Sequence, residues 1–474
     1  MSQKKRINMY KKGTRPQNSI EIPQQNVLKF IDLFAGIGGF HQALTSRGYR
    51  CVLASEIDKD CIQVYQDNYP IRTGNEENYI MNQDITKLET KDIPDFDILC
   101  AGFPCQSFSH AGKQQGFEDK TRGTLFYDIC RILKDKQPKY FILENVKNLK
   151  NHNKGETFKT IHKTLTEELG YLTHDEPIVL SPHHLGIPQN RERVFIIGKL
   201  KEFNNNNESI TRLKPYPVIV EEITKLKTEN SNKCRIDTIL ETDSTIEKDI
   251  LDYVNISDEN KQVINIWNKL VKHFNSKTTE KRLPGFPIWT YVWEKKYKTN
   301  SKGELLYDKN DNDNNNKIVV DQNNNETQSR IIPKWKQNFI KKNQEFYNNK
   351  DYHKFLKKWF QESKKNKNFV GARTKFEWQA GNFQDGDDLW KLMFTFRPSG
   401  IRVKRPTYAP TLVAMAHIPY IGSRKRKLTP KECSKLQSFP DNFKIDKKIT
   451  KAYKQFGNSV NVEVVKKILG YLMD

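Results

Sequence analysis

The feature that most constrains the fold is an alternation, between residues 28 and 200, of short apolar runs with segments of helical spacing. The runs include "VLKFIDLFA", "YRCVLASEID", "FDILCAGFP", "KYFILENV" and "RVFIIG", whereas "GGFHQALTSRG" and "LFYDICRILKDKQP" have apolar residues at helical spacing. Strands that are apolar on both faces belong to parallel sheets covered by helices on both sides. The sequence therefore predicts an α/β fold built on a parallel sheet.

The pattern changes near residue 201 and returns near residue 411. Between them Asn and Lys dominate, "PKWKQNFIKKNQEFYNNKDYHKFLKKWF" has a basic helical pattern, and "FTFRPSGIRVKRPTYAPTLVAM" is typical of strands joined by turns. After this region, "LTPKECSKLQSF" predicts a helix with Thr429 as N-cap and Pro430 at its first position. We expect a basic flexible tail at 1–27, a catalytic domain at 28–200 and 411–474, and a second domain inserted at 201–410.

The charge of the chain indicates the class of its partner. Lys and Arg number 80 against 57 Asp and Glu, a formal net charge of +23. This surplus favours nucleic acid, and the alternative is the lysine-rich surface of a compositionally biased genome. The seven cysteines form no C-x-x-C pair, so neither a metal site nor a disulfide framework is expected. Their scatter suits reduced thiols in a cytoplasmic protein. No segment approaches the roughly 18 continuous apolar residues of a membrane span, so no membrane partner is expected, and we expect a monomer.

A glycine-rich turn, "FAGIGG" at 34–39, follows the first strand and opens the first helix. Glycines there let the backbone approach a ligand, and Glu56 ends the next strand, where an acid binds ribose hydroxyls in dinucleotide-binding folds. Because the turn lacks the full dinucleotide spacing, a smaller adenosine ligand fits better than NAD. A plain strand–helix turn is the alternative. Asp84 in "NQDIT" is either an acceptor for an adenine amino group or an ordinary cap.

Four further residues have the chemistry of a reactive centre. Cys105 in "GFPCQSFS" lies just beyond a strand end, which favours a nucleophile whose pKa is lowered by neighbouring cations or dipoles. Glu144 in "FILENV" ends a buried strand, where desolvation raises a carboxyl pKa. Arg191 and Arg193 in "QNRERVFIIG" would share one face of an extended strand and converge on one anion. Surface charge is the alternative for this pair.

Six segments, "FIDLFAGIGGF", "GFPCQSFS", "FILENV", "PQNRERVFIIG", "RKLTPKECSKLQSFPDNF" and "GNSV", resemble in content and order the motifs of bacterial restriction–modification DNA (cytosine-5) methyltransferases. The resemblance implies a Rossmann-like S-adenosylmethionine-dependent methyltransferase sheet with an inserted, smaller target recognition domain. It implies duplex DNA as substrate, S-adenosyl-L-methionine as cofactor, no metal, and a cognate restriction endonuclease as a partner.

The resemblance also implies residue roles. Cys105 is the nucleophile, Glu144 contacts the cytosine ring, and Arg193, with Arg191 nearby, supports the site. The cofactor pocket is formed by Phe34, Gly36, Gly38, Glu56, Ile57, Asp84, Ile85, Leu125, Asn458, Ser459 and Val460. Ile57 departs from the family pattern, in which an aromatic residue often follows the ribose-binding glutamate.

Two regions are expected to contact DNA. One is the segment around the cysteine, with Gln106 and Ser109, and the other is the inserted domain. There the best candidates are the clustered cations of "RPSGIRVKRP" and the threonine of the family's threonine–leucine pair, namely Arg397, Arg402, Lys404, Arg405 and Thr411. The aromatic residues of "KWKQNF" and "FLKKWF" are expected to form that domain's own core, while some of the lysines contact phosphates.

The implied chemistry needs an extruded base. Attack of the Cys105 thiolate on C6 makes C5 of cytosine nucleophilic, Glu144 bonds N3, and C5 takes the methyl group before a base removes its proton. A stacked duplex does not permit this, so the base must flip out, and "SHAGKQQGFEDKTRG" is expected to close as a lid. An enzyme of the same fold acting on tRNA and a non-catalytic DNA-binding relative are the alternatives. The target sequence is not encoded in any of these patterns.

Overall fold

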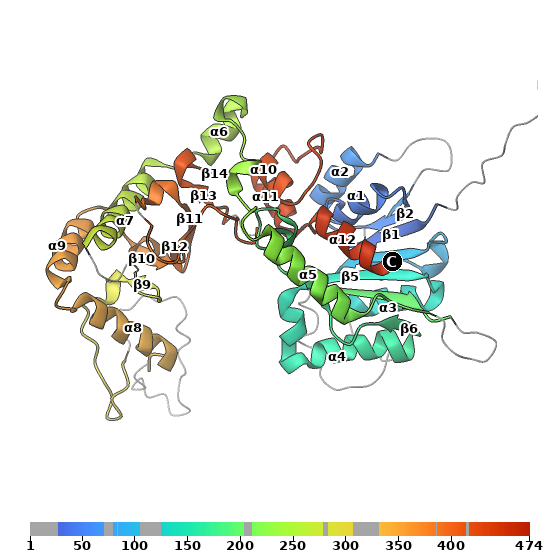
Figure 1. The fold of residues 1–474 in the computed structure, drawn as a ribbon, viewed down its shortest axis with the longest axis horizontal. Coiled ribbons are helices and arrows are strands. Elements are labelled where there is room, and N and C mark those ends of the chain that lie inside the picture. Colours follow the sequence, from blue (N-terminus) through green and yellow to red (C-terminus); the bar gives the residue numbers. More distant parts are fainter. Residues whose placement is uncertain are drawn as a thin grey trace, which may run out of the picture.

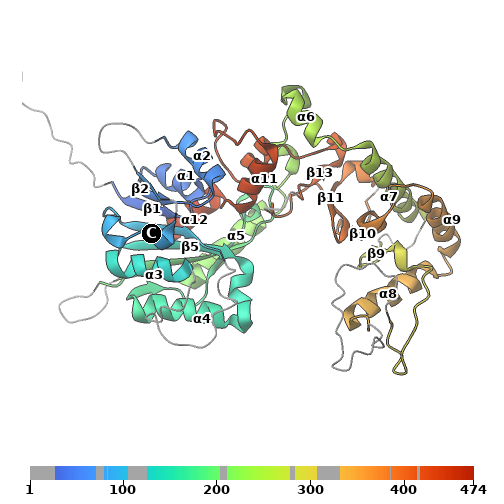
Figure 2. The same ribbon diagram turned by 180° about the vertical axis from the view of Figure 1, so that it is seen from behind.

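A computed structural model describes residues 27–70, 79–82, 84–104, 125–202, 211–277, 283–306, 331–384, 386–413 and 417–474. Figure 1 shows two lobes, each built around a β-sheet, and Figure 2 shows them from behind. The expected basic tail up to residue 26, and Cys105, Gln106 and Ser109 with the expected lid, lie outside the described residues. None of the helices in the described ranges has the length and apolar composition needed to span a bilayer.

The first lobe is built on an eight-stranded sheet in the order β3-β2-β1-β4-β5-β8-β6, with β7 also paired to β8. The strands are β1 (Lys29–Leu33), β2 (Arg50–Ser55), β3 (Ile80–Asn82), β4 (Ile98–Gly102), β5 (Tyr140–Val146), β6 (Tyr171–Thr173), β7 (Ile178–Leu180) and β8 (Arg193–Leu200). The first five are parallel, which confirms the prediction for β1, β2, β4 and β5, whereas the sequence pattern did not predict β3. The prediction is wrong for β8, which runs antiparallel to β5, β6 and β7. An apolar run indicates that a strand is covered on both faces, and in a mixed sheet this also holds for an antiparallel strand.

Helices cover both faces of this sheet. Successive residues of a strand point to opposite faces, so the apolar side chains of these strands need a cover on both sides. The helices are α1 (Gly39–Thr45), α2 (Lys59–Asn68), α3 (Leu125–Lys136), α4 (Glu156–Lys163), α11 (Ile449–Asn458) and α12 (Val462–Met473). Ile142 of β5 packs in a core with α1, α2, α11 and α12, while its neighbours Phe141 and Leu143 pack in another with α3 and α4. The C-terminal helices, red in Figure 1, thus complete the lobe that the N-terminal strands begin.

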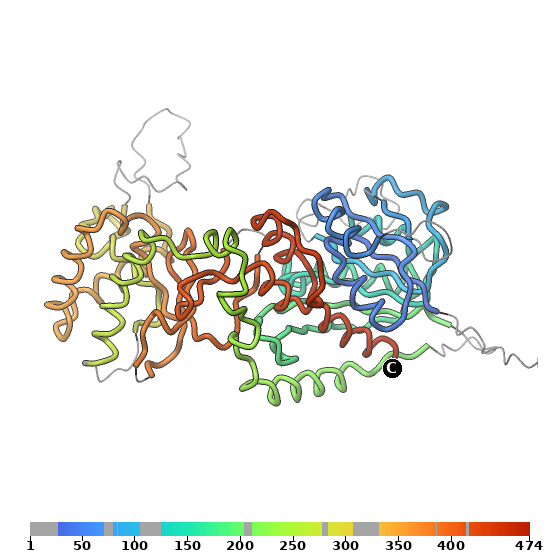
Figure 3. Tube along the Cα trace, turned by 90° about the horizontal axis from the view of Figure 1, so that it is seen from above, coloured from blue at the N-terminus to red at the C-terminus, as the bar shows by residue number. Residues whose placement is uncertain are grey.

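The second lobe begins later than the change in composition. Helix α5 (Tyr216–Asn230) runs along the first lobe in Figure 3, and Ile219, Ile236 and Ile239 are buried in the first lobe's core. The second lobe's core begins at Ile256. The expected boundary at residue 201 is therefore too early. The change in composition near residue 201 comes mainly from exposed residues. The lobe to which the segment after it belongs is decided instead by a few buried isoleucines.

The second lobe is built on a six-stranded sheet in the order β14-β13-β11-β12-β10-β9. Its elements are α6 (Lys248–Val254), α7 (Asp258–Lys277), β9 (Ile288–Trp289), α8 (Lys334–Tyr347), α9 (His353–Lys364), β10 (Lys375–Trp378), β11 (Met393–Arg397), β12 (Gly400–Lys404), β13 (Tyr420–Ile421) and β14 (Arg426–Lys427). Phe376, Phe394 and Val403 of the sheet pack with Trp267 of α7 and Trp359 of α9. The expected core role of the "FLKKWF" aromatic residues is confirmed for Trp359.

The opposite face of this sheet is charged. Glu377, Arg402 and Thr395 are paired across three neighbouring strands, so their side chains point to the same face. Residues two positions from each of them along its own strand point to that face as well. We call this side the cationic face, and its residues are Lys375 and Glu377 on β10, Arg397 on β11, and Arg402 and Lys404 on β12.

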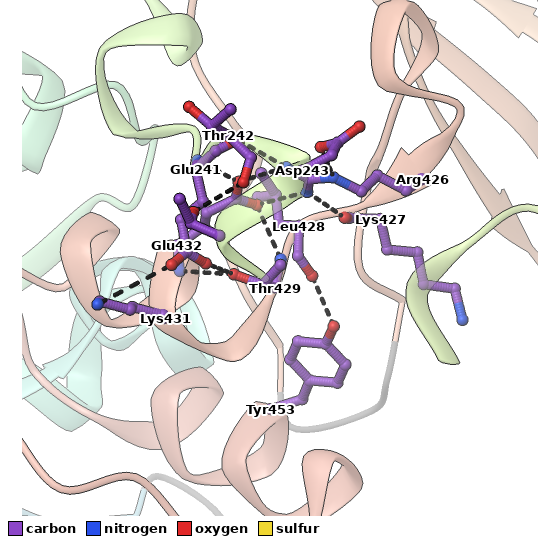
Figure 4. Close-up of polar contacts among 11 residues, drawn as sticks. Glu241, Thr242, Asp243, Arg426, Lys427, Leu428, Thr429, Lys431, Glu432 and Tyr453 are labelled. Atoms are coloured by element: carbon purple, nitrogen blue, oxygen red, sulfur yellow. Dashed lines mark hydrogen bonds and ion pairs between the residues drawn. The ribbon is translucent and has the colours of Figure 1, made fainter. Parts of the chain in front are cut away.

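Two chain segments that run between the lobes are joined by a buried ion cluster (Figure 4). Arg426 is 0% exposed and donates to the two carboxylate oxygens of Glu432, at 3.0 and 2.9 Å, and to Asp243, at 2.9 Å. Thr429 caps α10 (Pro430–Leu436), with Pro430 in the first turn, which confirms the predicted helix start. The segment that leaves the first lobe is therefore tied to the segment that returns.

Candidate active site

The glycine-rich turn lies between β1 and α1, at the carboxyl edge of the parallel strands. Phe34, Gly36 and Gly38 have positive φ angles of 56°, 55° and 88°. A Cβ on Gly38 would lie 2.4 Å from the ring of Tyr69, so only glycine fits there, whereas a Cβ on Gly36 would meet no described atom within 4 Å. The turn is therefore closed by Tyr69 on one side and open beside Gly36.

Glu56 directly follows β2, and backbone donors hold its carboxylate in place. Oε2 accepts from the N–H of Gly36 at 2.8 Å, and Oε1 accepts from the N–H groups of Ile57 and Asp58 at 2.9 and 2.8 Å. The acid is thus bonded to the glycine turn that sequence reasoning linked with it. An ionised carboxylate oxygen has two lone pairs, so Oε2 keeps one for a ligand hydroxyl.

Four residues expected near the adenosine differ in exposure. Ile57 is 73% exposed and offers an apolar surface. Asp84 accepts from the hydroxyl and the N–H of Thr86, at 2.7 and 3.1 Å, and these bonds lower its pKa and cap η1 (Ile85–Lys87). The Ile85 side chain is buried in the core, so only its backbone is available to a ligand, and Leu125 packs against the same core. The cap is observed, and the adenine contact of Asp84 stays a prediction.

The loop between α11 and α12 packs on the start of α1. A Cβ on Gly39 would lie 2.6 Å from Cγ2 of Val460 and 3.1 Å from Oγ of Ser459. Ser459 and Val460 are buried, while Asn458 is exposed at the end of α11. The fold therefore brings "FAGIGG" and "GNSV" into contact from opposite ends of the chain.

Glu144 and Arg193 form an ion pair where β5 and β8 run side by side. Nε of Arg193 lies 3.0 Å from Oε1 of Glu144, and the two side chains are 15% and 11% exposed. Burial raises the pKa of Glu144, and the positive charges of Arg193 and Arg191 oppose this rise. A Cβ on Gly102 would lie 3.3 Å from Oε2 of Glu144, so a glycine at the end of β4 leaves room for the carboxylate. Glu144 is thus a buried acid beside the strand that precedes Cys105.

Arg191 makes its hydrogen bonds elsewhere. Its guanidinium donates to the carbonyl oxygen of Leu412 at 2.8 Å, and to those of Gly457 and Ser459 at 2.9 and 2.8 Å, and the residue is 2% exposed. The expectation that both arginines converge on one anion is therefore wrong for Arg191. It precedes β8, and its side chain turns toward the "GNSV" loop. Arg191 is a positioning residue that joins the return from the second lobe to this loop.

Asn145 has a role that the sequence pattern did not reveal. Its Nδ2 donates to the carbonyl oxygen of Phe103 at 2.9 Å, and its Oδ1 accepts from the N–H of Val146 at 2.8 Å. It is 3% exposed. It therefore holds the main chain two residues before Cys105. The only sequence signal was a polar residue next to Glu144 at the end of an apolar strand.

Two of the residues expected to contact DNA make internal hydrogen bonds within the protein. Arg405 binds both carboxylate oxygens of Asp387 and donates to the carbonyl of Ala380. Thr411 donates to the carbonyl of Asn190 at 2.7 Å. These bonds hold the second lobe and its connection to the first, and a DNA contact by Arg405 or Thr411 stays a prediction.

The other expected contacts, Arg397, Arg402 and Lys404, gather on the cationic face. Nε of Arg402 lies 2.8 Å from Oε2 of Glu377. Burial and the charge of Arg402 lower the pKa values of Arg397 and Lys404. Three cations beside one carboxylate leave a positive surplus that a phosphate would relieve.

Comparison with known proteins decides the family. The profile of C-5 cytosine-specific DNA methylases matches residues 28–473. The chain belongs to this family. It is a DNA (cytosine-5) methyltransferase, and its cofactor is S-adenosylmethionine.

Several relatives match along nearly the whole chain. Type II methyltransferase M.AluI of Cellulosimicrobium cellulans is 33% identical over 482 residues, which cover 93% of this chain and 91% of that protein. M.HgiCI of Herpetosiphon aurantiacus is 34% identical over 476 residues, or 94% and 97% of the two chains. M.HpaII of Haemophilus parainfluenzae is 51% identical over 182 residues, which cover 38% of this chain and 48% of that protein.

The cofactor of this methyltransferase fits the open side of the glycine turn. Gly36 leaves space there, and its N–H lies 2.8 Å from Oε2 of Glu56, which has a lone pair for a ribose hydroxyl. Gly38 and Gly39 pack too closely on Tyr69 and Val460 to admit ligand atoms between them. When bound, S-adenosylmethionine supplies a methyl group from its sulfonium centre.

The methyltransferase has seven cysteines, and six lie in the described residues. These six are all buried, namely Cys51, Cys61, Cys100, Cys130, Cys234 and Cys433. Burial raises the pKa of each of these thiols, which keeps them protonated near neutral pH. The thiolate is the reactive form, so Cys105 is the remaining candidate nucleophile.

Proposed function

We propose that the chain methylates C5 of cytosine within one specific duplex sequence, through an extruded base and a covalent bond between Cys105 and C6. The observation that carries this proposal is the buried Glu144–Arg193 pair beside the end of β4, since Cys105 follows Gly102 by three residues. A pair this buried meets a cytosine only if the base leaves the stack and enters the site.

Each proposed catalytic residue has one task. The Cys105 thiolate bonds to C6, and the electron pair of the C5–C6 double bond makes C5 nucleophilic. Glu144, whose pKa is raised by burial, donates toward N3 and stabilises the ring, while Arg193 holds the carboxyl in position. C5 then takes the methyl group. A base removes the C5 proton, and the thiolate leaves C6, which regenerates the cysteine.

The cationic face is the proposed surface for the DNA backbone. Arg397, Arg402 and Lys404 lie together there with a surplus of positive charge over the one carboxylate of Glu377, and phosphate contacts position a duplex without selecting its sequence. Because the relatives are named Type II methyltransferases, we also propose that a cognate restriction endonuclease cuts the sites that this chain methylates.

A trapped complex tests the covalent step. The target is first mapped as the methylated cytosine in DNA from cells that express the protein. Duplex DNA with 5-fluorocytosine at that position should then attach to the protein in the presence of S-adenosylmethionine, because fluorine cannot be removed as a proton. The band should survive denaturing electrophoresis and be absent for Cys105→Ala, while Cys234→Ala retains it. No trapped band on a site that is otherwise methylated would refute the covalent role, and methylation of tRNA in preference to duplex DNA would refute the substrate.

A further inference from the structure

The cationic face continues into an aromatic surface at the edge strand β9. Trp289 of β9 pairs with Lys375 of β10, so its ring lies on the same side of the sheet as the cations. The ring centroid of Trp289 lies 5.3 Å from that of Phe339 on α8 and 6.0 Å from that of Tyr291, and Phe339 lies 6.3 Å from Trp335. We call Trp289, Tyr291, Phe339 and Trp335 the aromatic patch.

The aromatic patch is held in place and yet exposed. The N–H of Trp289 donates to Oδ1 of Asn343 at 2.7 Å, which fixes β9 on α8. Trp335 is 60% exposed and Tyr291 is 37% exposed, whereas Trp359 of α9 is 4% exposed. The expectation that the aromatic residues of this segment form the core is therefore wrong for Trp335, and its large apolar surface is available to a partner.

Lysines lie on the same elements as the aromatic patch. Helix α8 has four lysines and one glutamate, and its Lys334, Lys341 and Lys342 are exposed. Nζ of Lys375 lies 5.2 Å from the ring centroid of Tyr291 and 6.0 Å from that of Trp289. Exposed rings interleaved with ammonium groups suit a duplex, because the rings pack on the apolar sides of the sugars while the ammonium groups meet phosphates.

We propose that the aromatic patch binds duplex DNA that flanks the target on one side and adds affinity that is independent of sequence. This inference rests on the proposed function, in which the cationic face meets the DNA backbone. Strands β11, β12, β10 and β9 are neighbours in the sheet, in this order. The first three bear the cations, and the aromatic patch begins on the fourth. A duplex that follows the cationic face outward therefore reaches the aromatic patch beyond the bases that are read.

The length dependence of DNA affinity tests the proposal. Duplexes that contain the target are extended stepwise on one side or on the other. Wild-type affinity should rise about tenfold with extension on one side only, and Trp335→Ala should lose most of this gain while Trp335→Phe keeps it. The matched control is Tyr253→Ala, which removes a 43%-exposed ring on α6, at the opposite end of the lobe from α8 in Figures 1 and 2.

Two outcomes of this length series overturn the inference and leave the proposed function intact. In the first outcome, wild type binds duplexes of all lengths with the same affinity. In the second, Trp335→Ala gains as much affinity as wild type when the duplex is extended. In both, the shortest duplex is still methylated. Failure of the proposed function would instead appear as no methylation on any duplex.

The fluorescence of Trp335 is a second measurement. All seven tryptophans lie in the described residues, and Trp335 is the one with an exposed side chain. Acrylamide should quench wild type more than Trp335→Phe in the absence of DNA, and a long duplex should abolish this difference. If the two proteins are quenched equally without DNA, another part of the chain or a second copy already covers the aromatic patch, and the inference is refuted.

Discussion

Replacing Arg191 by lysine is expected to weaken both the fold and the cofactor site. The guanidinium donates to Leu412 on one side and to Gly457 and Ser459 on the other, in a position that is 2% exposed. Lysine keeps the charge but concentrates its donors at one point, whereas the guanidinium is a planar fork. An ammonium group can therefore serve one of the two segments but not both.

The size of the effect follows from the bonds that are lost. A hydrogen bond to a charged group contributes about 1.5–3 kcal/mol, so losing one or two of them lowers the free energy of unfolding by about 2–4 kcal/mol after partial relaxation. The loop that Arg191 holds also packs on Gly39 at the glycine turn. If about 1.4 kcal/mol of the loss acts on that loop, the Kd for S-adenosylmethionine rises about tenfold.

Urea denaturation measures the first effect and titration calorimetry the second. Arg426→Lys is the matched control, because Arg426 is 0% exposed and binds Glu432 and Asp243 in the ion cluster of Figure 4. It should lose comparable stability and keep its cofactor affinity. The coupling assigned to Arg191 is refuted if Arg191→Lys binds the cofactor as tightly as wild type, or if both variants lose the same affinity.

Three further predictions concern the remaining site residues. Glu56→Gln should raise the Kd for S-adenosylmethionine about tenfold and leave DNA affinity unchanged, because an amide loses one acceptor; calorimetry with equal cofactor affinities would contradict this. Burial raises the pKa of Glu144 above its ordinary 4.5, so its ionisation costs more in the folded than in the unfolded state. Wild-type stability should therefore fall relative to Glu144→Gln as the pH rises above about 4.5, and a pH-independent difference in urea denaturation would exclude the shift. DNA affinity should fall with salt at a log–log slope of about −0.9 per phosphate contact, and Arg402→Ala should reduce that slope by about one contact; an unchanged slope would remove Arg402 from the DNA surface.

Much of the fold and of the site followed from residues that are close in sequence. Apolar runs predicted β1, β2, β4 and β5, and the Thr429–Pro430 pair predicted the start of α10. Glycines before a helix predicted the turn between β1 and α1. The spacing of 20 residues linked Glu56 to this turn, and the hydrogen bond from Gly36 to Glu56 is observed. These features depend on backbone preference and side-chain periodicity, which short segments carry by themselves.

Contacts between distant segments decided the rest. Arg191 and Arg193 look equivalent in "NRERV", yet one bonds carbonyls more than 200 residues away and the other pairs with Glu144. Trp335 and Trp359 look equivalent in their basic helices, yet only one is buried. The direction of β8 and the lobe to which α5 belongs were undecided for the same reason. A side chain's local pattern specifies which element it joins, but its partner and its exposure depend on what the folded chain packs against it.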